Sequence, residues 1–398
     1  MQCNNCAGSL RFDPDKGKLV CKSCGGEFEV THTDDKGLVD INSVFEDTDE
    51  ITREDINVYT CSTCGGSIAV NDVEMTSSCP FCGNSGVIFD RVAKRRRPDG
   101  IIPFAFDAKS AQEKVRDHLK GSAFLSKKAK EMPFVNTVGV YIPYYIVSAE
   151  SRSKVVYQYD FKDNEGNVVR TEQLCRTLRC FYDRLIIEAS AALTNAAANM
   201  TEPYDLAGIR VFENGYLQGF YSDMADEDPE ELLNQADKRI REYETSEFAA
   251  TKTVPDGYYN IAWDSHIKYK GKAFYALFPM WFVRGEYNGK NIIMLVNGQT
   301  GKVVGGPEYS KKMFTAASLS MSVLPIIGMT VVGALGSATA AGLLLSGSIV
   351  GFLGVLAGII GLGSAICAME EKQMAKIRDV IDLSSSRRLV KFISRRKG

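Results

Sequence analysis

Eight of the eleven cysteines lie in four Cys-x-x-Cys pairs, and this arrangement constrains the fold more than any other feature of the chain. The pairs form two matching units, in each of which fourteen residues separate one pair from the next. Each unit supplies four thiolates, the number that a closed tetrahedral zinc site requires. The sequence therefore predicts two structural Zn²⁺ ions, bound by Cys3, Cys6, Cys21 and Cys24 and by Cys61, Cys64, Cys79 and Cys82.

The residues between the cysteine pairs are typical of a β-hairpin. In the first unit, Leu10 and Phe12 lead into a turn at 14–17. The alternative for the same cysteines is a disulfide framework. However, the sequence shows no secretory signal, and a repeated paired-thiol spacing indicates metal binding in a reducing compartment. We therefore expect zinc ribbons at 1–33 and 58–90.

The segment from Met313 to Met369 contains no charged residue and no His. A membrane-spanning helix needs about 20 apolar residues, so this block is long enough for two. We expect transmembrane helices at about 313–335 and 338–367, within a hairpin at 311–369. The alternative is a buried hairpin of a soluble protein, but soluble helices of this length normally show a polar face. Glycines on the second helix allow close packing, within the hairpin or between copies in a homo-oligomer.

Basic residues flank the apolar block on both sides, beginning with Lys311 and Lys312. This pattern predicts a multi-pass protein of the cell membrane with both termini in the cytoplasm. The tail at 370–398 is expected to be cytoplasmic and to contact anionic lipid. The residues expected to make this contact are Arg387, Arg388, Lys391, Arg395, Arg396 and Lys397.

The N-terminal part of the chain is acidic, since residues 1–90 contain six Lys or Arg and sixteen Asp or Glu. Phosphate contacts supply much of the affinity for nucleic acids, so this charge argues against nucleic acid as a partner. The acidic segment at 34–57 is either a solvated linker or a short partner-binding segment. The basic segment at 91–97 has three interpretations: a solvated linker, a contact with anionic lipid, or a contact with nucleic acid. Its candidate contact residues are Lys94, Arg95, Arg96 and Arg97.

The middle of the chain, 98–310, is typical of a globular domain. A capping-box pattern at Ser110 and a proline at Pro229 each predict the start of a helix. Six β-rich stretches surround these helices: 138–148, 154–161, 176–188, 259–269, 273–286 and 291–304. The segment 141–147 resembles 277–283, and each follows a predicted helix. The predicted fold is therefore multi-domain: two small β zinc ribbons, a central α+β domain of two related subunits, and a two-helix transmembrane hairpin.

Several motifs accompany the paired cysteines, namely Ile142–Tyr145, Glu202–Asp205, Tyr216–Phe220, Pro279–Trp281 and Asn297–Lys302. Together they resemble a group of bacterial membrane proteins described as TFIIB-type zinc ribbon-containing, some of which carry a primosomal protein N′-like helicase label. The resemblance implies no established catalytic activity. It also implies, for some members, an association with membrane-stress systems of the phage-shock-protein-A and stomatin-like types.

Sequence motifs of common enzymes are absent. None of the four Gly-Lys pairs is followed by Ser or Thr, as a P-loop would require. A zinc site filled by four cysteines leaves no open position for a substrate. We therefore predict a membrane-anchored cytoplasmic adaptor that binds protein partners, with an acidic docking face on the ribbons. Two alternatives stay open: a membrane-tethered nucleic-acid-binding protein and an enzyme active in the central domain.

Overall fold

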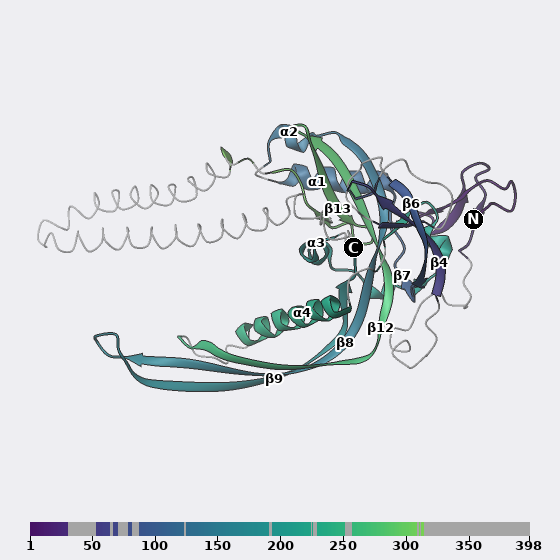
Figure 1. Ribbon diagram of the computed structural model, residues 1–398. Coiled ribbons are helices and arrows are strands. Elements are labelled where there is room, and N and C mark those ends of the chain that lie inside the picture. The colour runs from purple at the N-terminus through teal and green to yellow at the C-terminus, as the bar shows by residue number, and fades with distance from the viewer. Residues whose placement is uncertain are drawn as a thin grey trace, which may run out of the picture.

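Long antiparallel strands dominate the structure (Figure 1). It is a computed structural model that describes residues 1–30, 53–63, 67–70, 79–81, 87–122, 125–190, 193–223, 225, 229–250, 257–308, 310 and 312–313.

The N-terminal residues form a small three-stranded sheet. Its strands are β1 (Leu10–Asp13), β2 (Lys18–Cys21) and β3 (Glu27–Phe28), in the order β1-β2-β3. The carboxylate of Asp13 accepts hydrogen bonds from the backbone N–H groups of the next turn residues, and Gly17 has a φ of 65°. These two features close the tight hairpin that the sequence predicts between β1 and β2.

A second sheet of eleven strands forms the rest of the β-structure in the described part of the chain. Its order is β10-β7-β12-β8-β11-β5-β4-β6; in addition, β13 pairs with β12, β14 pairs with β13, and β9 pairs with β8. The strands are β4 (Arg53–Cys61), β5 (Ser67–Val70), β6 (Val87–Arg96), β7 (Gly100–Ile101), β8 (Phe134–Lys162), β9 (Val168–Glu188), β10 (Arg210–Val211), β11 (Tyr221–Ser222), β12 (Tyr259–Tyr287), β13 (Lys290–Asn297) and β14 (Val303–Val304).

The two similar sequence segments lie on the two longest strands, β8 and β12, and pair with each other. In their antiparallel register Ile142 is opposite Phe278, its equivalent in the repeated motif, so a local twofold axis relates the segments. The repeat therefore builds one shared sheet. The predicted α+β domain of two related subunits is therefore wrong. Sequence similarity indicated that the two strands are related, but it could not show that they pair with each other in one sheet.

The strands of the second predicted ribbon also belong to the large sheet. β4 lies between β5 and β6, and β5 pairs with β11, which in turn pairs with β8. Residues 91–96, where we expected a linker, lie on β6. Segments predicted for the second ribbon and for the central domain thus contribute strands to one continuous sheet.

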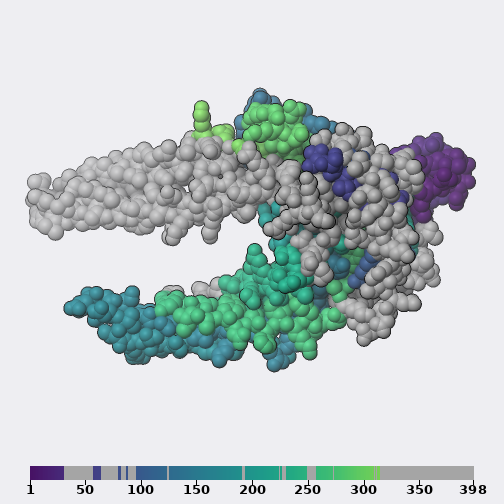
Figure 2. Space-filling model, viewed as in Figure 1, coloured from purple at the N-terminus to yellow at the C-terminus, as the bar shows by residue number. Residues whose placement is uncertain are grey.

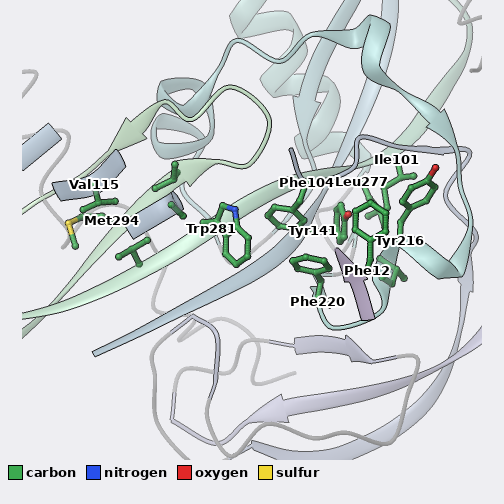
Figure 3. Packing of buried hydrophobic residues seen from close by; sticks show 14 of the residues in the cluster. Phe12, Ile101, Phe104, Val115, Tyr141, Tyr216, Phe220, Leu277, Trp281 and Met294 are labelled. Carbon is green, nitrogen blue, oxygen red and sulfur yellow. The ribbon is translucent and has the colours of Figure 1, made fainter. Parts of the chain in front are cut away.

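Among the described residues, four helices and two short 3₁₀ turns accompany the sheets. They are α1 (Ala108–Gly121), α2 (Lys127–Lys130), α3 (Asn195–Thr201), α4 (Pro229–Ala250), η2 (Leu206–Gly208) and η3 (Asn214–Leu217). Helix α1 buries Ala111, Val115 and Leu119 in a large apolar cluster with β12 and β13. Figure 3 shows the aromatic part of this cluster, where the rings of Phe104 and Phe220 stack 4.3 Å apart.

The distal parts of β8, β9 and β12 leave the body of the molecule as a three-stranded arm (Figures 1 and 2). Helix α4 lies along one face of this arm, and Ala236 and Ile240 pack there against Leu185 and Ile187 of β9. The hydroxyl of Ser151 donates a hydrogen bond of 2.5 Å to the carboxylate of Glu244, and both side chains are fully buried.

The predicted transmembrane hairpin is also corrected. No helix in the described part of the chain is long and apolar enough to cross a membrane. The longest, α4, has charged residues along its length, such as Glu231, Arg239 and Glu247. The predicted helices at 313–335 and 338–367 lie outside the described residues, apart from Met313. The described part of the chain therefore does not support the predicted transmembrane hairpin or the multi-pass location with both termini in the cytoplasm.

Candidate metal centre

The first four cysteines converge on one point and could hold a metal ion. Their Sγ atoms all lie within 4.8 Å of one another. The Sγ atoms of Cys3 and Cys24 are 3.6 Å apart, and those of Cys6 and Cys21 are 3.5 Å apart. A tetrahedral Zn²⁺ with Zn–S bonds of about 2.3 Å places its sulfurs roughly 3.8 Å apart, so the observed spacing fits a zinc site.

The two cysteine pairs are positioned by tight turns at the ends of the small sheet. The backbone N–H of Asn5 donates to the Sγ of Cys3, and that of Ser23 donates to the Sγ of Cys21, each at 3.4 Å. Gly25 follows the second pair with a φ of 72°, a conformation that glycine adopts without strain. These turns aim the sulfurs inward and satisfy part of their hydrogen-bonding capacity.

The electrostatics of the four thiols favour a bound cation. The backbone N–H of Cys24 makes the largest contribution in lowering the pKa of Cys21 to about 6. Desolvation opposes this shift, and the backbone N–H of Ser23 adds to it. At Cys6 a backbone hydrogen bond from Gly8 lowers the pKa, but its neighbours Cys24 and Cys21 raise it to a net value of about 12. Deprotonating one thiol therefore opposes deprotonating the next, and a divalent cation would remove this conflict.

The second cysteine set is described only in part. Cys61 ends β4 and Cys79 lies in the loop before Phe81, and both cysteines are buried. The guanidinium of Arg284 on β12 donates to the backbone carbonyls of Cys79 (2.8 Å) and Pro80 (2.6 Å). Cys64 and Cys82 lie outside the described residues, so the second predicted zinc site stays a prediction.

The first ribbon is packed onto the body of the protein, which the sequence did not indicate. The backbone N–H of Phe12 donates to the carbonyl of Gln218 at 3.0 Å, and its ring meets that of Tyr216 at 5.2 Å, edge to face. Leu19 and Val30 are buried in the same cluster. The sequence contains one signal of this docking: Phe12 and Leu19 are large apolar residues that a ribbon without a docking surface would leave exposed to water.

The predicted anion-contact residues before Pro98 contribute to the fold. Arg96 pairs with Asp99 at 2.6 Å and donates to the carbonyl of Ala273. Arg97 donates to the carbonyl of Phe212 and lies over its ring. The backbones of Lys94 and Arg95 lie on β6, opposite those of Asp55 and Glu54 on β4. Contact of residues 94–97 with lipid or nucleic acid stays a prediction. Contact of the six basic tail residues with lipid also stays a prediction, because these residues lie outside the described part of the chain.

Two of the sequence motifs meet in one clamp. The side-chain amide of Asn297, at the end of β13, donates to the carbonyls of Thr201 (2.9 Å) and Pro203 (3.1 Å). Its oxygen accepts from two backbone N–H groups of the following turn. Gln299 adds paired hydrogen bonds with the backbone of Asp205, at 2.7 and 2.9 Å. The motifs 202–205 and 297–302 therefore stabilise each other through these hydrogen bonds.

Comparison with known proteins shows one informative similarity. The chain is 28% identical over 323 residues to an uncharacterised protein, YdjG, of Bacillus subtilis (strain 168), an alignment that covers 78% of this chain and 90% of that protein. No protein-family model matches the chain. No solved structure matches it either.

Proposed function

We propose that this chain is a zinc-ribbon protein that binds other proteins and does not transform a substrate. The metal would be zinc, because four thiolates at tetrahedral spacing suit this ion. All four positions around the metal would be occupied by cysteines, so the ion would be structural. A second zinc at Cys61, Cys64, Cys79 and Cys82 belongs to the same proposal.

The zinc would hold the N-terminus of the chain in its docked position. A ribbon of about 30 residues has too small a core to fold alone, so metal binding supplies much of its folding free energy. Phe12 and Leu19 can pack against the body only if the hairpin is folded. Loss of the metal should therefore release the ribbon from η3.

The observation that carries the binding role is the projecting arm. Large apolar side chains remain exposed along it, among them Val169 (64% exposed), Phe181 (61%) and Tyr259 (46%). Exposed apolar groups on a projecting element are typical of protein interaction sites. Arg179 and Lys270 lie against the ring of Phe181, and such a cation-lined aromatic suits a protein partner with acidic and apolar groups.

Affinity capture with the intact chain tests this function. The double variant Val169→Glu and Phe181→Glu should lose the proteins that the wild type retains, because charges replace the apolar contacts. The control is Lys128→Glu, an exposed residue on α2 far from the arm in sequence. Retention of the same proteins by the arm variant and the control would contradict the proposal.

A further inference from the structure

We propose that two copies of this chain pair through the free edge of β9, antiparallel and in one register centred on Leu174. The inference rests on the proposed protein-binding role of the arm and names a second copy as the partner of one edge. Each arm would then contribute three strands to a continuous sheet of six.

The edge of β9 is open to a further strand. Among the described strands β9 pairs with β8 alone, over the register from Tyr144–Glu188 to Lys162–Val168. Its other edge presents backbone N–H and C=O groups that another extended chain can satisfy. The 21-residue strand contains no Pro, so no residue on it lacks the backbone N–H that a further strand needs. Helix α4 covers a face of the arm and leaves this edge accessible (Figure 1).

The side chains of β9 are complementary to themselves about Leu174. An antiparallel pair centred there puts Leu174 opposite its own copy and Glu172 opposite Arg176 of the other chain. The twofold axis produces this ion pair twice. The same register places the remaining neighbours opposite each other as Thr171 with Thr177, Gln173 with Cys175, and Arg170 with Leu178. Every charged residue near the axis thus meets an opposite charge or a neutral side chain.

Neighbouring registers lack this complementarity. An axis one residue earlier places Arg170 opposite Arg176, and like charges directly opposite destabilise a sheet. An axis one residue later places Glu172 opposite Leu178, so both cross-chain ion pairs with Arg176 are lost. Of these three registers, the charge pattern favours the one centred on Leu174.

A groove lies where the second arm would end. In the register centred on Leu174, Val168 at the tip of one arm lies opposite Cys180 near the base of the other. Cys180 and Tyr182 form one wall of a groove of about 560 Å³, whose other wall includes Arg239 and Tyr243 of α4. The tip residue Val168 is 52% exposed in the single chain, and the pairing would place it at the mouth of this groove.

Charge reversal on the intact chain tests the proposal by light scattering after size-exclusion chromatography. The wild type should have the mass of a dimer. Glu172→Arg and Arg176→Glu should each weaken dimerisation by about tenfold or more, because each creates two like-charge pairs. The double variant, with both changes, should restore the dimer. Lys268→Glu is the control and should remain dimeric, because Lys268 lies on β12, which β8 separates from β9.

A disulfide reports the register directly. Residues opposite each other in an antiparallel pair have Cα atoms about 4.5–5.5 Å apart, within reach of a disulfide. In a Cys175→Ser background, Leu174→Cys should cross-link two chains under mild oxidation. Leu178→Cys should not, because it lies opposite Arg170.

The proposal is overturned by a monomeric wild type, by single reversals that leave the dimer intact, or by absence of the Leu174→Cys cross-link. A monomer that still captures proteins through Val169 and Phe181 would refute this pairing and leave the proposed binding function standing. A dimer that captures no protein would support this pairing and refute the proposed binding of other proteins by the arm.

Discussion

Replacing Phe12 by alanine should separate the first ribbon from the body of the protein while sparing its metal site. Phe12 is only 2% exposed, and its ring contacts Tyr216. Truncating a buried Phe to Ala typically costs about 3–5 kcal/mol. We expect a loss of about 3 kcal/mol, at the lower end, because the backbone hydrogen bond from Phe12 to Gln218 can persist.

Guanidinium unfolding of the intact chain would measure this loss, and hydrogen exchange would locate it. Amides of β1 and of η3 should exchange faster in Phe12→Ala, since the ribbon opens more often. The zinc content should stay unchanged, because no cysteine contributes to the ring contact. Lys16→Ala, on the exposed turn of the same hairpin, is the control and should leave the stability nearly unchanged. If Phe12→Ala behaves like this control, the ribbon is not docked as described.

Further substitutions test other parts of the fold. Cys3→Ser should remove one zinc per chain by elemental analysis and increase protease cleavage within residues 1–30, because the ribbon depends on its metal. Asp107→Ala should lower the free energy of unfolding by about 1 kcal/mol, as expected for a lost helix cap. The backbone N–H of Ser110 lowers the pKa of Asp107, so this contribution should be present above the ordinary aspartate pKa and lost as the pH falls through the lowered value. Asn297→Asp should cost about 3 kcal/mol or more in thermal unfolding, because a carboxylate would face two backbone carbonyls.

Local features of the fold were predictable from the sequence. The spacing of Cys3, Cys6, Cys21 and Cys24 predicted a four-thiolate cluster, and the structure brings these sulfurs together. The start of α4 at Pro229 was also correct, because proline suits the first position of a helix. Such signals depend on a few residues that are close in the sequence. They can therefore be recognised without knowledge of the tertiary fold.

Helix α1 shows how a local signal can mislead by one turn. The capping-box pattern pointed to Ser110 as the N-cap. The structure instead uses Asp107, whose carboxylate accepts from the backbone N–H of Ser110 at 2.8 Å. Both residues are good caps, and packing of the first helical turn against the body decides between them.

The full length of the long strands could not be predicted, because it depends on contacts with residues that are distant in the sequence. We expected separate strands at 138–148 and 154–161, since a polar segment interrupts the apolar pattern. In the structure β8 runs through both. Ser151 lies on this segment and is buried beneath α4, where Glu244 accepts its hydrogen bond. A buried polar pair from distant parts of the chain looks like a solvent-exposed loop in the sequence.

X-ray absorption at the zinc edge, combined with elemental analysis of the intact chain, tests the central claim most directly. A structural four-cysteine site predicts bound zinc with four sulfur ligands at about 2.3 Å and no oxygen or nitrogen ligand. The proposal of two sites predicts two zinc ions per chain, falling to one in Cys61→Ser. A folded chain without zinc would contradict the account, as would zinc with an oxygen ligand in place of one of the four cysteines of residues 3–24.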